Sequence, residues 1–169
     1  MLTCYVGPMF GGKTTRLLSA LRAAANESRR VELYKPQIDV RYGADVVSHD
    51  GDCRPCTSVT AAEQIEPEPG GVVGIDEAFM IPGIAARVRE LLLRDTTVFV
   101  SSLLCDEYQQ VFPTMAALVP LASRVEVCAA RCEVCASPAL HIKRVAPYDG
   151  RWVGGKELYE PRCFVHHSC

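Results

Sequence analysis

The sequence predicts an α/β fold in which helices flank a parallel β-sheet. Short apolar runs alternate along the chain with segments whose apolar residues recur at helical spacing, which is the order of elements in sheets with right-handed crossovers. The run Val72–Ile75 has the unbroken apolar composition of a strand buried on both faces. Hydrophobic residues make up 49% of the 169 residues and charged residues 22%, so the chain can bury a core and does not have the composition of a disordered protein.

Each element is expected from its local pattern. Residues 1–6 are an apolar run that ends at Gly7 and Pro8, which predicts a buried strand entering a loop. Apolar residues at helical spacing predict helices over 13–25 and 84–94, and a shorter helix is expected over 113–118. Further strands are expected over 31–35, 72–75 and 97–101, and the alternating residues 124–128 are expected to form a last core strand.

Two stretches depart from this alternation. After Ala130, cysteine, proline and glycine become frequent and helical periodicity disappears, so we expect an α/β domain over residues 1–130 and a small second unit over residues 131–169. Residues 44–71 also lack a strong period, and their proline- and glycine-rich end at 66–71 predicts a loop or linker.

Charge and apolar content exclude several classes of protein. The formal net charge is -2, and a nucleic-acid-binding domain would be expected to be strongly basic, so no nucleic-acid partner is predicted. No apolar stretch approaches the roughly 20 residues that span a bilayer, and the first residues lack a leader pattern. We therefore expect a cytoplasmic protein without a membrane partner. In that reducing compartment, nine cysteines with CxxC spacings favour metal binding or free thiols over disulfides.

The first loop carries a phosphate-binding motif. Its sequence, G-P-M-F-G-G-K-T, satisfies G-x-x-x-x-G-K-[ST] and lies between an expected strand and an expected helix. The glycines allow successive backbone N–H groups to face a polyphosphate, and the helix adds its positive end. Lys13 is expected to neutralise phosphate oxygens and Thr14 to hold Mg²⁺. The alternative, a glycine-rich turn with a solvated lysine, is disfavoured by this context. The predicted ATP-binding residues here are Gly7, Pro8, Met9, Phe10, Gly11, Gly12, Lys13, Thr14 and Thr15.

Two carboxylates follow the strand over 72–75. Asp76 and Glu77 stand at its carboxyl end, where ligands gather in open α/β sheets. Asp76 is expected to hold Mg²⁺ and to join the ATP site. Glu77 is expected to orient and deprotonate an attacking hydroxyl, although alone it could simply cap the next helix.

These residues do not by themselves separate a kinase from an ATPase, because both need a phosphate cradle, Mg²⁺ and a placed base. An ATPase whose cysteine-rich unit binds a macromolecule is the alternative to a kinase, and a nucleotide-binding module without activity is a third hypothesis. The last would require Glu77 to be incidental.

The second unit carries a predicted zinc site. Cys132 and Cys135 form one CxxC pair, and Cys163 and His166 form a second pair with the same spacing, which is typical of closed structural zinc sites. Such a site contributes folding energy to a unit too small for its own core. Three alternatives stay open: His167 or Cys169 could replace His166, and the CxxC pair of Cys53 and Cys56 could replace the second pair.

Together these features resemble the type II thymidine kinase family over almost the whole chain. The resemblance consists of G-P-M-F-G-G-K-T at 7–14, Y-K-P at 34–36 with Asp39, Arg41 and Tyr42, S-H-D-G at 48–51, G-I-D-E at 74–77, L-V-P-L-A at 118–122, Cys132 and Cys135, V-G-G at 153–155, Y-E-P-R-C at 159–163 and His166.

The resemblance implies transfer of the ATP γ-phosphate to the 5′-hydroxyl of thymidine or deoxyuridine. It implies that Glu77 is the general base, that Lys13 and Arg41 assist at the phosphate, and that Asp39 lies near Mg²⁺. The segment between the zinc pairs would fold as a lasso over the nucleoside. A homotetramer and inhibition by thymidine triphosphate (dTTP) are also implied. The expected nucleoside-binding residues are Met9, Leu103, Tyr108, Val153, Gly154, Gly155 and Tyr159.

This chain departs from the family pattern near the expected base. Phe79 stands where glutamine is common, and Leu104 where an aspartate is usual. Glu107 occupies the position of a phenylalanine that packs on the base, so we expect the next residue, Tyr108, to supply the flat aromatic face. These changes concern the choice of nucleoside and leave the phosphate chemistry intact.

Overall fold

A six-stranded parallel sheet forms the centre of the molecule. In this computed structural model, the structure describes residues 1–40, 43, 45–48, 51–147 and 154–167. The sheet has the order β5-β2-β6-β7-β1-β8, and every neighbouring pair is parallel. Its strands are β1 (Leu2–Val6), β2 (Val31–Pro36), β5 (Thr57–Val59), β6 (Val72–Ile75), β7 (Thr97–Ser102) and β8 (Arg124–Val127).

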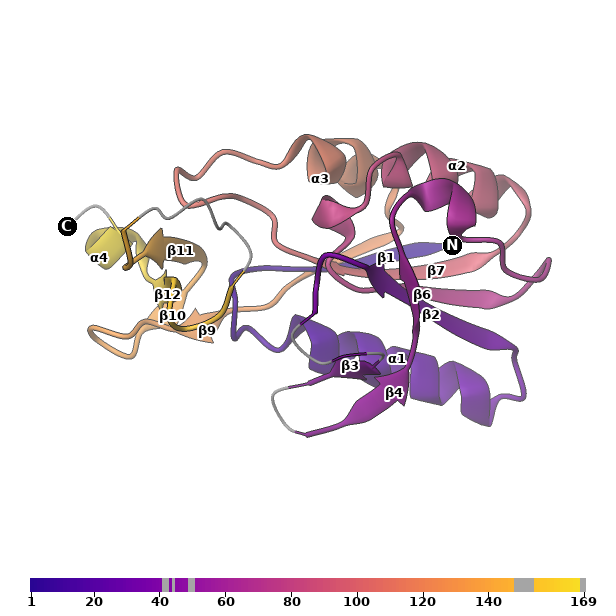
Figure 1. Cartoon of the computed structure of the whole chain (residues 1–169), viewed down its shortest axis with the longest axis horizontal. Helices are drawn as coiled ribbons and strands as arrows, with labels where there is room; N and C mark the ends of the chain where they lie inside the picture. Colours follow the sequence, from indigo (N-terminus) through magenta and orange to yellow (C-terminus); the bar gives the residue numbers. More distant parts are fainter. Residues whose placement is uncertain (41–42, 44, 49–50, 148–153, 168–169) are drawn as a thin grey trace.

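Helices cover both faces of this sheet (Figure 1). The long helix α1 (Lys13–Asn26) lies on one face, where its leucines at 17, 18 and 21 are buried. On the opposite face lie α2 (Ile84–Leu93) and α3 (Pro113–Leu118), whose apolar residues pack with those of the sheet. Gly74 allows α1 to approach, because a Cβ there would lie 2.5 Å from the Leu21 Cδ1. The α/β class and each helix and strand expected from the sequence are confirmed to within one or two residues.

The strand β8 differs from its expected role. It pairs with β1 at the edge of the sheet, and its valines, Val125 and Val127, are 41% and 57% exposed. The expectation of a core strand was therefore wrong, because alternation along an edge strand does not ensure that either face is covered.

The segment 44–71 is more ordered than expected. It contains a hairpin of β3 (Asp45–Val47) and β4 (Cys53–Pro55), then β5 and a 3₁₀ turn at Ala62–Gln64. Each strand has three residues, which is too short for a periodic signal. The stretch 66–71 forms neither helix nor strand, as predicted.

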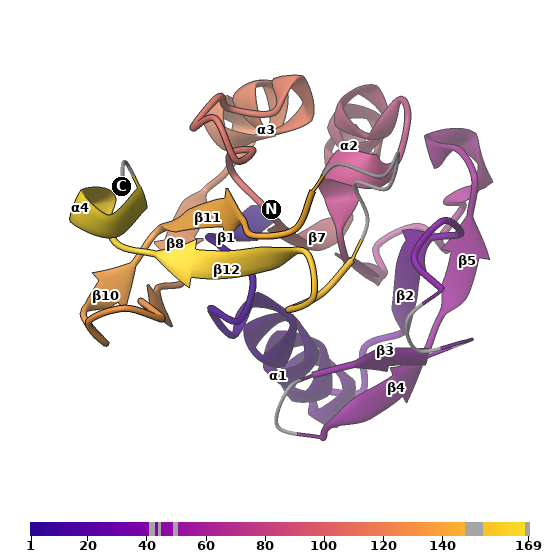
Figure 2. The ribbon, with the colours of Figure 1, turned by 60° about the vertical axis from the view of Figure 1, so that its left-hand side comes forward.

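From residue 130 onward the chain forms short antiparallel hairpins beside the central sheet (Figure 2). β9 (Ala130–Arg131) pairs with β10 (Pro138–Ala139), and β11 (His141–Arg144) pairs with β12 (Tyr159–Arg162), both antiparallel. The short helix α4 (Phe164–His167) follows. We call the described residues from 130 to 167 the hairpin unit.

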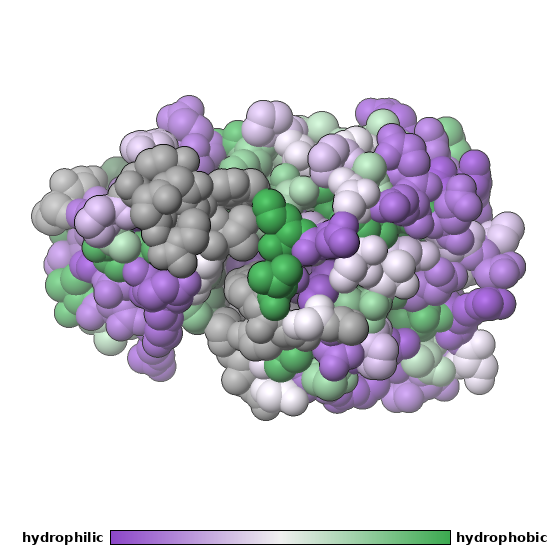
Figure 3. Space-filling model, in the orientation of Figure 1, coloured by the Kyte–Doolittle hydropathy of each residue, from purple (hydrophilic) through white to green (hydrophobic). Residues whose placement is uncertain are grey.

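The surface is mixed in character. Figure 3 shows hydrophobic side chains gathered near the middle of one face, with hydrophilic side chains over much of the α2 side. Among the residues that the structure describes, no helix combines the length and apolar composition needed to cross a bilayer.

Candidate active site

The turn after β1 has the close packing that its glycines predict. A Cβ on Gly7 would lie 2.1 Å from the carbonyl oxygen of Cys128, and a Cβ on Gly11 would lie 2.5 Å from the same atom. Both contacts are with backbone, which cannot move aside. Gly12 adopts φ 77° at the N-cap of α1, a conformation that costs glycine little. The turn therefore needs glycine at these positions to carry its N–H groups toward the start of the helix.

Lys13 lies folded over this turn. Its Nζ donates a 2.6 Å hydrogen bond to the carbonyl oxygen of Pro8, and the residue is only 7% exposed. A buried ammonium held at the first turn of a helix adds its charge to the positive end of the helix dipole. This arrangement provides the local positive potential that a phosphate group requires.

Asp76 is held at the carboxyl end of β6 by two hydroxyls. Ser101, in the neighbouring strand β7, donates a hydrogen bond to its Oδ1, and the Thr14 Oγ1 donates to the same oxygen at 3.3 Å. Asp76 and Ser101 are both buried. The role of Ser101 was missed from the sequence. Its only signal was a pair of serines ending an otherwise apolar strand.

Glu77 has an unusual backbone conformation. Its φ of 48° and ψ of 44° lie in the left-handed region, which is uncommon for a residue other than glycine and costs about 1–3 kcal/mol. Such conformations concentrate at functional sites, where the surrounding structure holds them. The Glu77 Oε2 is shielded from solvent. The alternative role, a cap of the next helix, finds little support: Glu77 is the N-cap of a three-residue 3₁₀ turn, and its side chain makes no capping hydrogen bond there.

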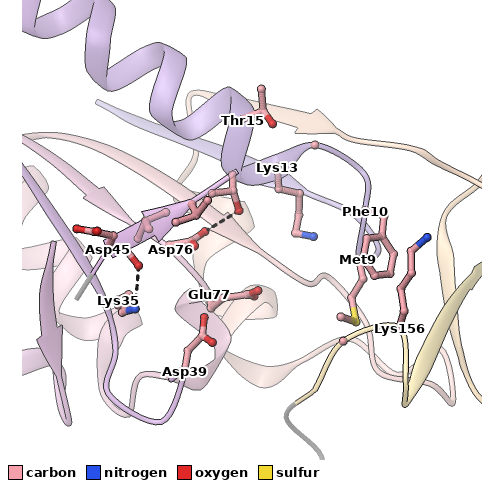
Figure 4. A pocket seen from close by; sticks show the side chains of 15 residues that line it. Met9, Phe10, Lys13, Thr15, Lys35, Asp39, Asp45, Asp76, Glu77 and Lys156 are labelled. Atoms are coloured by element: carbon pink, nitrogen blue, oxygen red, sulfur yellow. Dashed lines mark hydrogen bonds between the residues drawn. The ribbon is translucent and has the colours of Figure 1, made fainter. Parts of the chain in front are cut away.

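Most of the predicted phosphate-site residues that the structure describes line one cavity of about 190 Å³ (Figure 4). Lys13 projects into it from α1, while Glu77 and the buried Asp39 project from the other side. Gly7, Pro8 and Gly11 support the turn without lining the cavity. The lining residues are Met9, Phe10, Gly12, Lys13, Thr14, Thr15, Lys35, Asp39, Asp45, Val46, Val47, Asp76, Glu77, Gly155 and Lys156.

Two further lysines line this cavity without having been predicted. Lys35 is buried at the end of β2, where its Nζ donates to the carbonyl oxygens of Gly43 at 2.6 Å and Asp45 at 2.9 Å. It thereby fixes the entry to the β3–β4 hairpin. Lys156, from the hairpin unit, places its Nζ 5.1 Å from the ring centroid of Phe10, so segments from early and late in the sequence meet at the cavity.

A second, more apolar cavity of about 90 Å³ adjoins the first. Glu77 and Met9 line both cavities. The second cavity has an aromatic wall made by Phe79 and Phe112, whose ring centroids are 4.5 Å apart. Its remaining lining residues are Met80, Leu103, Asp106, Glu107, Ile142, Gly154 and Tyr159.

The expected aromatic residue at this cavity needs correction. Tyr108 is 75% exposed and is not among the lining residues. The chain reverses direction at this point, with the Asp106 Oδ1 accepting hydrogen bonds from the backbone N–H of Tyr108 and of Gln110, and this turn carries the Tyr108 ring to the surface. Phe79, one of the residues that depart from the family pattern, supplies the aromatic face together with Phe112.

The predicted lasso residues reach both cavities. Gly155 lines the first cavity, and Gly154 and Tyr159 line the second. The Tyr159 hydroxyl accepts a 2.9 Å hydrogen bond from Arg144, whose guanidinium carbon lies 5.3 Å from the Tyr159 ring centroid. Val153 and Arg41, predicted to bind nucleoside and phosphate, lie outside the described residues.

The hairpin unit brings the four predicted zinc ligands together. Their ligand atoms all lie within 4.8 Å of one another. The Cys163 Sγ is 3.2 Å from the His166 Nδ1, and the Cys135 Sγ is 3.8 Å from the Cys163 Sγ. Three thiols and one imidazole at this spacing fit a closed, tetrahedral zinc site.

The surroundings of Cys132 favour the thiolate, which is the form of cysteine that can bind a metal ion. Burial raises its pKa, but hydrogen bonds from the backbone N–H groups of Cys163, Cys135 and Val134 outweigh burial and lower the pKa to about 6. Of the alternative ligands that the structure describes, none joins the cluster. His167 points to other partners, Cys53 and Cys56 are not members of the described cluster, and Cys169 lies outside the described residues.

Comparison with known proteins identifies the family. A sequence model described as "Thymidine kinase" matches residues 1–167. A thymidine kinase of Rhodothermus sp. (strain ITI 518) is 39% identical over 93% of this chain and 76% of its own length. Those of Oryza sativa subsp. japonica and Thermococcus kodakarensis are 34% and 33% identical over 96% and 98% of this chain, which correspond to 64% and 93% of their own lengths.

The chain belongs to the thymidine kinase family. Membership implies an ATP-dependent deoxynucleoside kinase, with ATP and thymidine as substrates, and the family resemblance seen in the sequence is confirmed. The cysteine and histidine cluster is compatible with zinc.

Proposed function

We propose that the chain transfers the γ-phosphate of ATP to the 5′-hydroxyl of thymidine, or of deoxyuridine, to give the nucleoside monophosphate and ADP. We call the first cavity, beside Lys13, the phosphate cavity and the second, beside Phe79, the apolar cavity. One observation supports the proposal most directly: Glu77 lines both. A carboxylate on that boundary is adjacent to both the phosphate that leaves one substrate and the hydroxyl that receives it.

The phosphate cavity would bind the ATP triphosphate. Backbone N–H groups of the turn between Met9 and Thr14 and the Lys13 ammonium would provide donors and positive charge for its oxygens. Lys35, Lys156 and the predicted Arg41 would add positive charge around the transferred group, which stabilises charge spread over its oxygens in the transition state.

Mg²⁺ would be held by oxygen ligands at the same cavity. Thr14 and Asp76 are already joined by a hydrogen bond, and Asp39 lines the cavity with its carboxylate. Hydroxyl and carboxylate oxygens are the ligands Mg²⁺ prefers. When bound, the ion would neutralise phosphate charge and orient the triphosphate.

Glu77 would act as the general base. Its carboxylate would accept the proton of the 5′-hydroxyl as that oxygen forms a bond to the γ-phosphorus, while the bond between the γ-phosphorus and the bridging oxygen breaks and ADP leaves with the electron pair. Holding the hydroxyl in line with the phosphorus is the main contribution the protein makes in such transfers.

The apolar cavity would hold the nucleoside. Phe79 and Phe112 offer flat faces for a pyrimidine ring, and Met9, Leu103 and Ile142 complete the apolar wall. Gly154, Gly155 and Tyr159, with Val153, would close over it from the hairpin unit. We propose that residues 1–130 form the nucleotide-binding domain and that residues 131–169 form a zinc-binding lasso domain. A homotetramer, inhibition by dTTP and a cytoplasmic location remain predictions from the family resemblance.

A turnover assay tests this function. Purified protein is incubated with ATP and Mg²⁺, alone and with thymidine, deoxyuridine, deoxycytidine, deoxyadenosine or deoxyguanosine, and ADP and nucleoside monophosphate are both quantified. We expect ADP and thymidine monophosphate in equal amounts and little ADP without a nucleoside. ADP production that no nucleoside stimulates would instead support the ATPase alternative.

A further inference from the structure

The side chain of His167 connects the hairpin unit to the wall of the apolar cavity. His167 ends the short helix α4 and is half-buried. Its Nε2 lies 3.0 Å from the carbonyl oxygen of Glu107 and 3.1 Å from the carbonyl oxygen of Ile142. Both Glu107 and Ile142 line the apolar cavity, although they belong to segments 35 residues apart in the sequence.

The chemistry of these partners fixes the role of each ring nitrogen. A backbone carbonyl oxygen only accepts hydrogen bonds, so the His167 Nε2 must carry a proton and donate to both. The other nitrogen, Nδ1, is 2.8 Å from the side-chain Nε2 of Gln109, which donates to it. A ring with its proton on Nε2 therefore satisfies all three contacts.

The segment that His167 holds is a tight reversal between β7 and α3. A bridge pairs Cys105 with Val111, and the backbone N–H of Phe112 donates to Leu104 at 3.1 Å. At its tip, Gln109 adopts φ 63°. A residue other than glycine stays in this conformation only where its surroundings hold it, and the Gln109 side chain is anchored on His167.

We propose that His167 is a positioning residue for the nucleoside site: it holds the reversal at 103–112 against β11 and so sets the width of the apolar cavity. The cavity wall on this side is made by Leu103, Glu107 and Phe112 from the reversal and by Ile142 from β11. The His167 side chain hydrogen-bonds to both segments. The proposal rests on the proposed function insofar as it takes this cavity to be the nucleoside site.

The neighbouring residue in α4 gives this contact a second consequence. His166 belongs to the predicted zinc cluster, and the backbone N–H of His167 donates to the carbonyl oxygen of Cys163, another member, at 2.9 Å. The short helix α4 thus carries a predicted zinc ligand, His166, beside His167, which bonds to the cavity wall. Zinc bound to His166 would order α4 and so hold His167 near Glu107 and Ile142.

Three variants test the proposal in the full chain. His167→Phe keeps a flat ring and removes both nitrogens, while His167→Gln retains an amide that can donate to a carbonyl oxygen. Val165→Ala is the matched control, because it changes α4 at a largely exposed side chain. For each protein we would measure zinc content, hydrogen exchange of residues 103–112, and the KM for thymidine, the KM for ATP and kcat.

We expect His167→Phe to bind zinc as the wild type does, to exchange the amides of 103–112 faster, and to raise the KM for thymidine about tenfold with the KM for ATP unchanged. His167→Gln should recover part of both effects, and Val165→Ala should show neither. If His167→Phe loses zinc or unfolds, Gln109→Ala, which leaves α4 intact, must show the faster exchange and the higher thymidine KM.

The outcomes separate this inference from the proposed function. Unchanged exchange and unchanged thymidine KM in zinc-loaded His167→Phe would overturn the positioning role while leaving the kinase assignment intact. Faster exchange of 103–112 in a protein whose wild type phosphorylates no nucleoside would support the positioning role and overturn the kinase assignment.

Discussion

Ser101 in β7 donates a hydrogen bond to the Oδ1 of Asp76 at the end of β6. The two residues stand side by side at the carboxyl edge of adjacent parallel strands, and both are buried. The carboxylate that faces Thr14 is therefore oriented by a hydroxyl that does not itself line the phosphate cavity. Partners of this kind fix the direction in which a ligating oxygen points.

Replacing Ser101 by alanine is expected to weaken both folding and metal binding. The variant leaves the buried Asp76 carboxylate without this donor, so the free energy of unfolding should fall by about 1.5–3 kcal/mol. The Mg²⁺ concentration required for half-maximal turnover should rise about tenfold. Urea unfolding and a Mg²⁺ titration at saturating ATP measure the two effects.

Ser102→Ala is the matched control for this prediction. Ser102 is equally buried, but its Oγ donates at 2.9 Å to the carbonyl oxygen of Leu103 and not to Asp76. It should cost about 1 kcal/mol of stability and leave the Mg²⁺ requirement unchanged. A similar Mg²⁺ requirement in both variants would show that Ser101 does not orient the metal ligand.

Glu77→Gln is expected to remove the base while keeping the shape of the site. The amide cannot accept the hydroxyl proton, so kcat should fall about 10²–10⁴-fold, whereas ATP binding, measured by calorimetry, should change little. Glu27→Gln, an exposed substitution at the end of α1, serves as the control. A kcat within threefold of the wild type in Glu77→Gln would eliminate the general-base role.

The two aromatic positions near the nucleoside site give opposite expectations. Phe112→Ala removes one face of the Phe79 and Phe112 wall, so the KM for thymidine should rise about tenfold, as the loss of an aromatic contact and its buried area predicts. Tyr108→Ala should leave that KM unchanged, because its ring is 75% exposed. Steady-state kinetics on both variants would show whether this assignment of the stacking residue is right.

Zinc retention is expected to depend on pH through Cys132. Because its pKa is lowered from 9.0 to about 6, the thiolate and the stability it contributes are fully present above the ordinary thiol value and are lost as pH falls through about 6. We expect about one zinc per chain at pH 7.5 and release below pH 6, followed with a colorimetric chelator. Cys53→Ser/Cys56→Ser should retain zinc, and loss of zinc in that double variant would contradict the ligand set.

The parts of the fold that were predictable from sequence are those with long or compositionally simple signals. The leucines of α1 and the apolar run of β6 reveal their environments directly, because burial on one or both faces requires those residues. The strands β3, β4 and β5 were missed since three residues carry no period. The exposure of Val125 and Val127 in β8 depends on strand order, which alternation alone does not encode.

Some residues of the candidate site could be predicted from local motifs, and others could not. The turn at 7–14, Asp76, Glu77 and the four zinc ligands are local motifs whose spacing carries their chemistry, and the structure brings each group together. Ser101, Lys35 and Lys156 act through contacts between distant segments, so no local sequence pattern predicts their roles. The same is true of Tyr108, since only the path of the reversal at 103–112 determines which side of the chain faces the cavity.

Met9 belongs to the predicted phosphate-binding turn and also lines the apolar cavity. Glu77, which follows β6, lines both cavities as well. With both substrates bound as proposed, an adjustment of the turn to an incoming triphosphate would also shift the wall of the cavity assigned to the nucleoside. By thermodynamic reciprocity, each substrate should then alter the affinity for the other by the same factor. We would therefore expect the enzyme to respond to the pair of substrates and not only to each molecule separately.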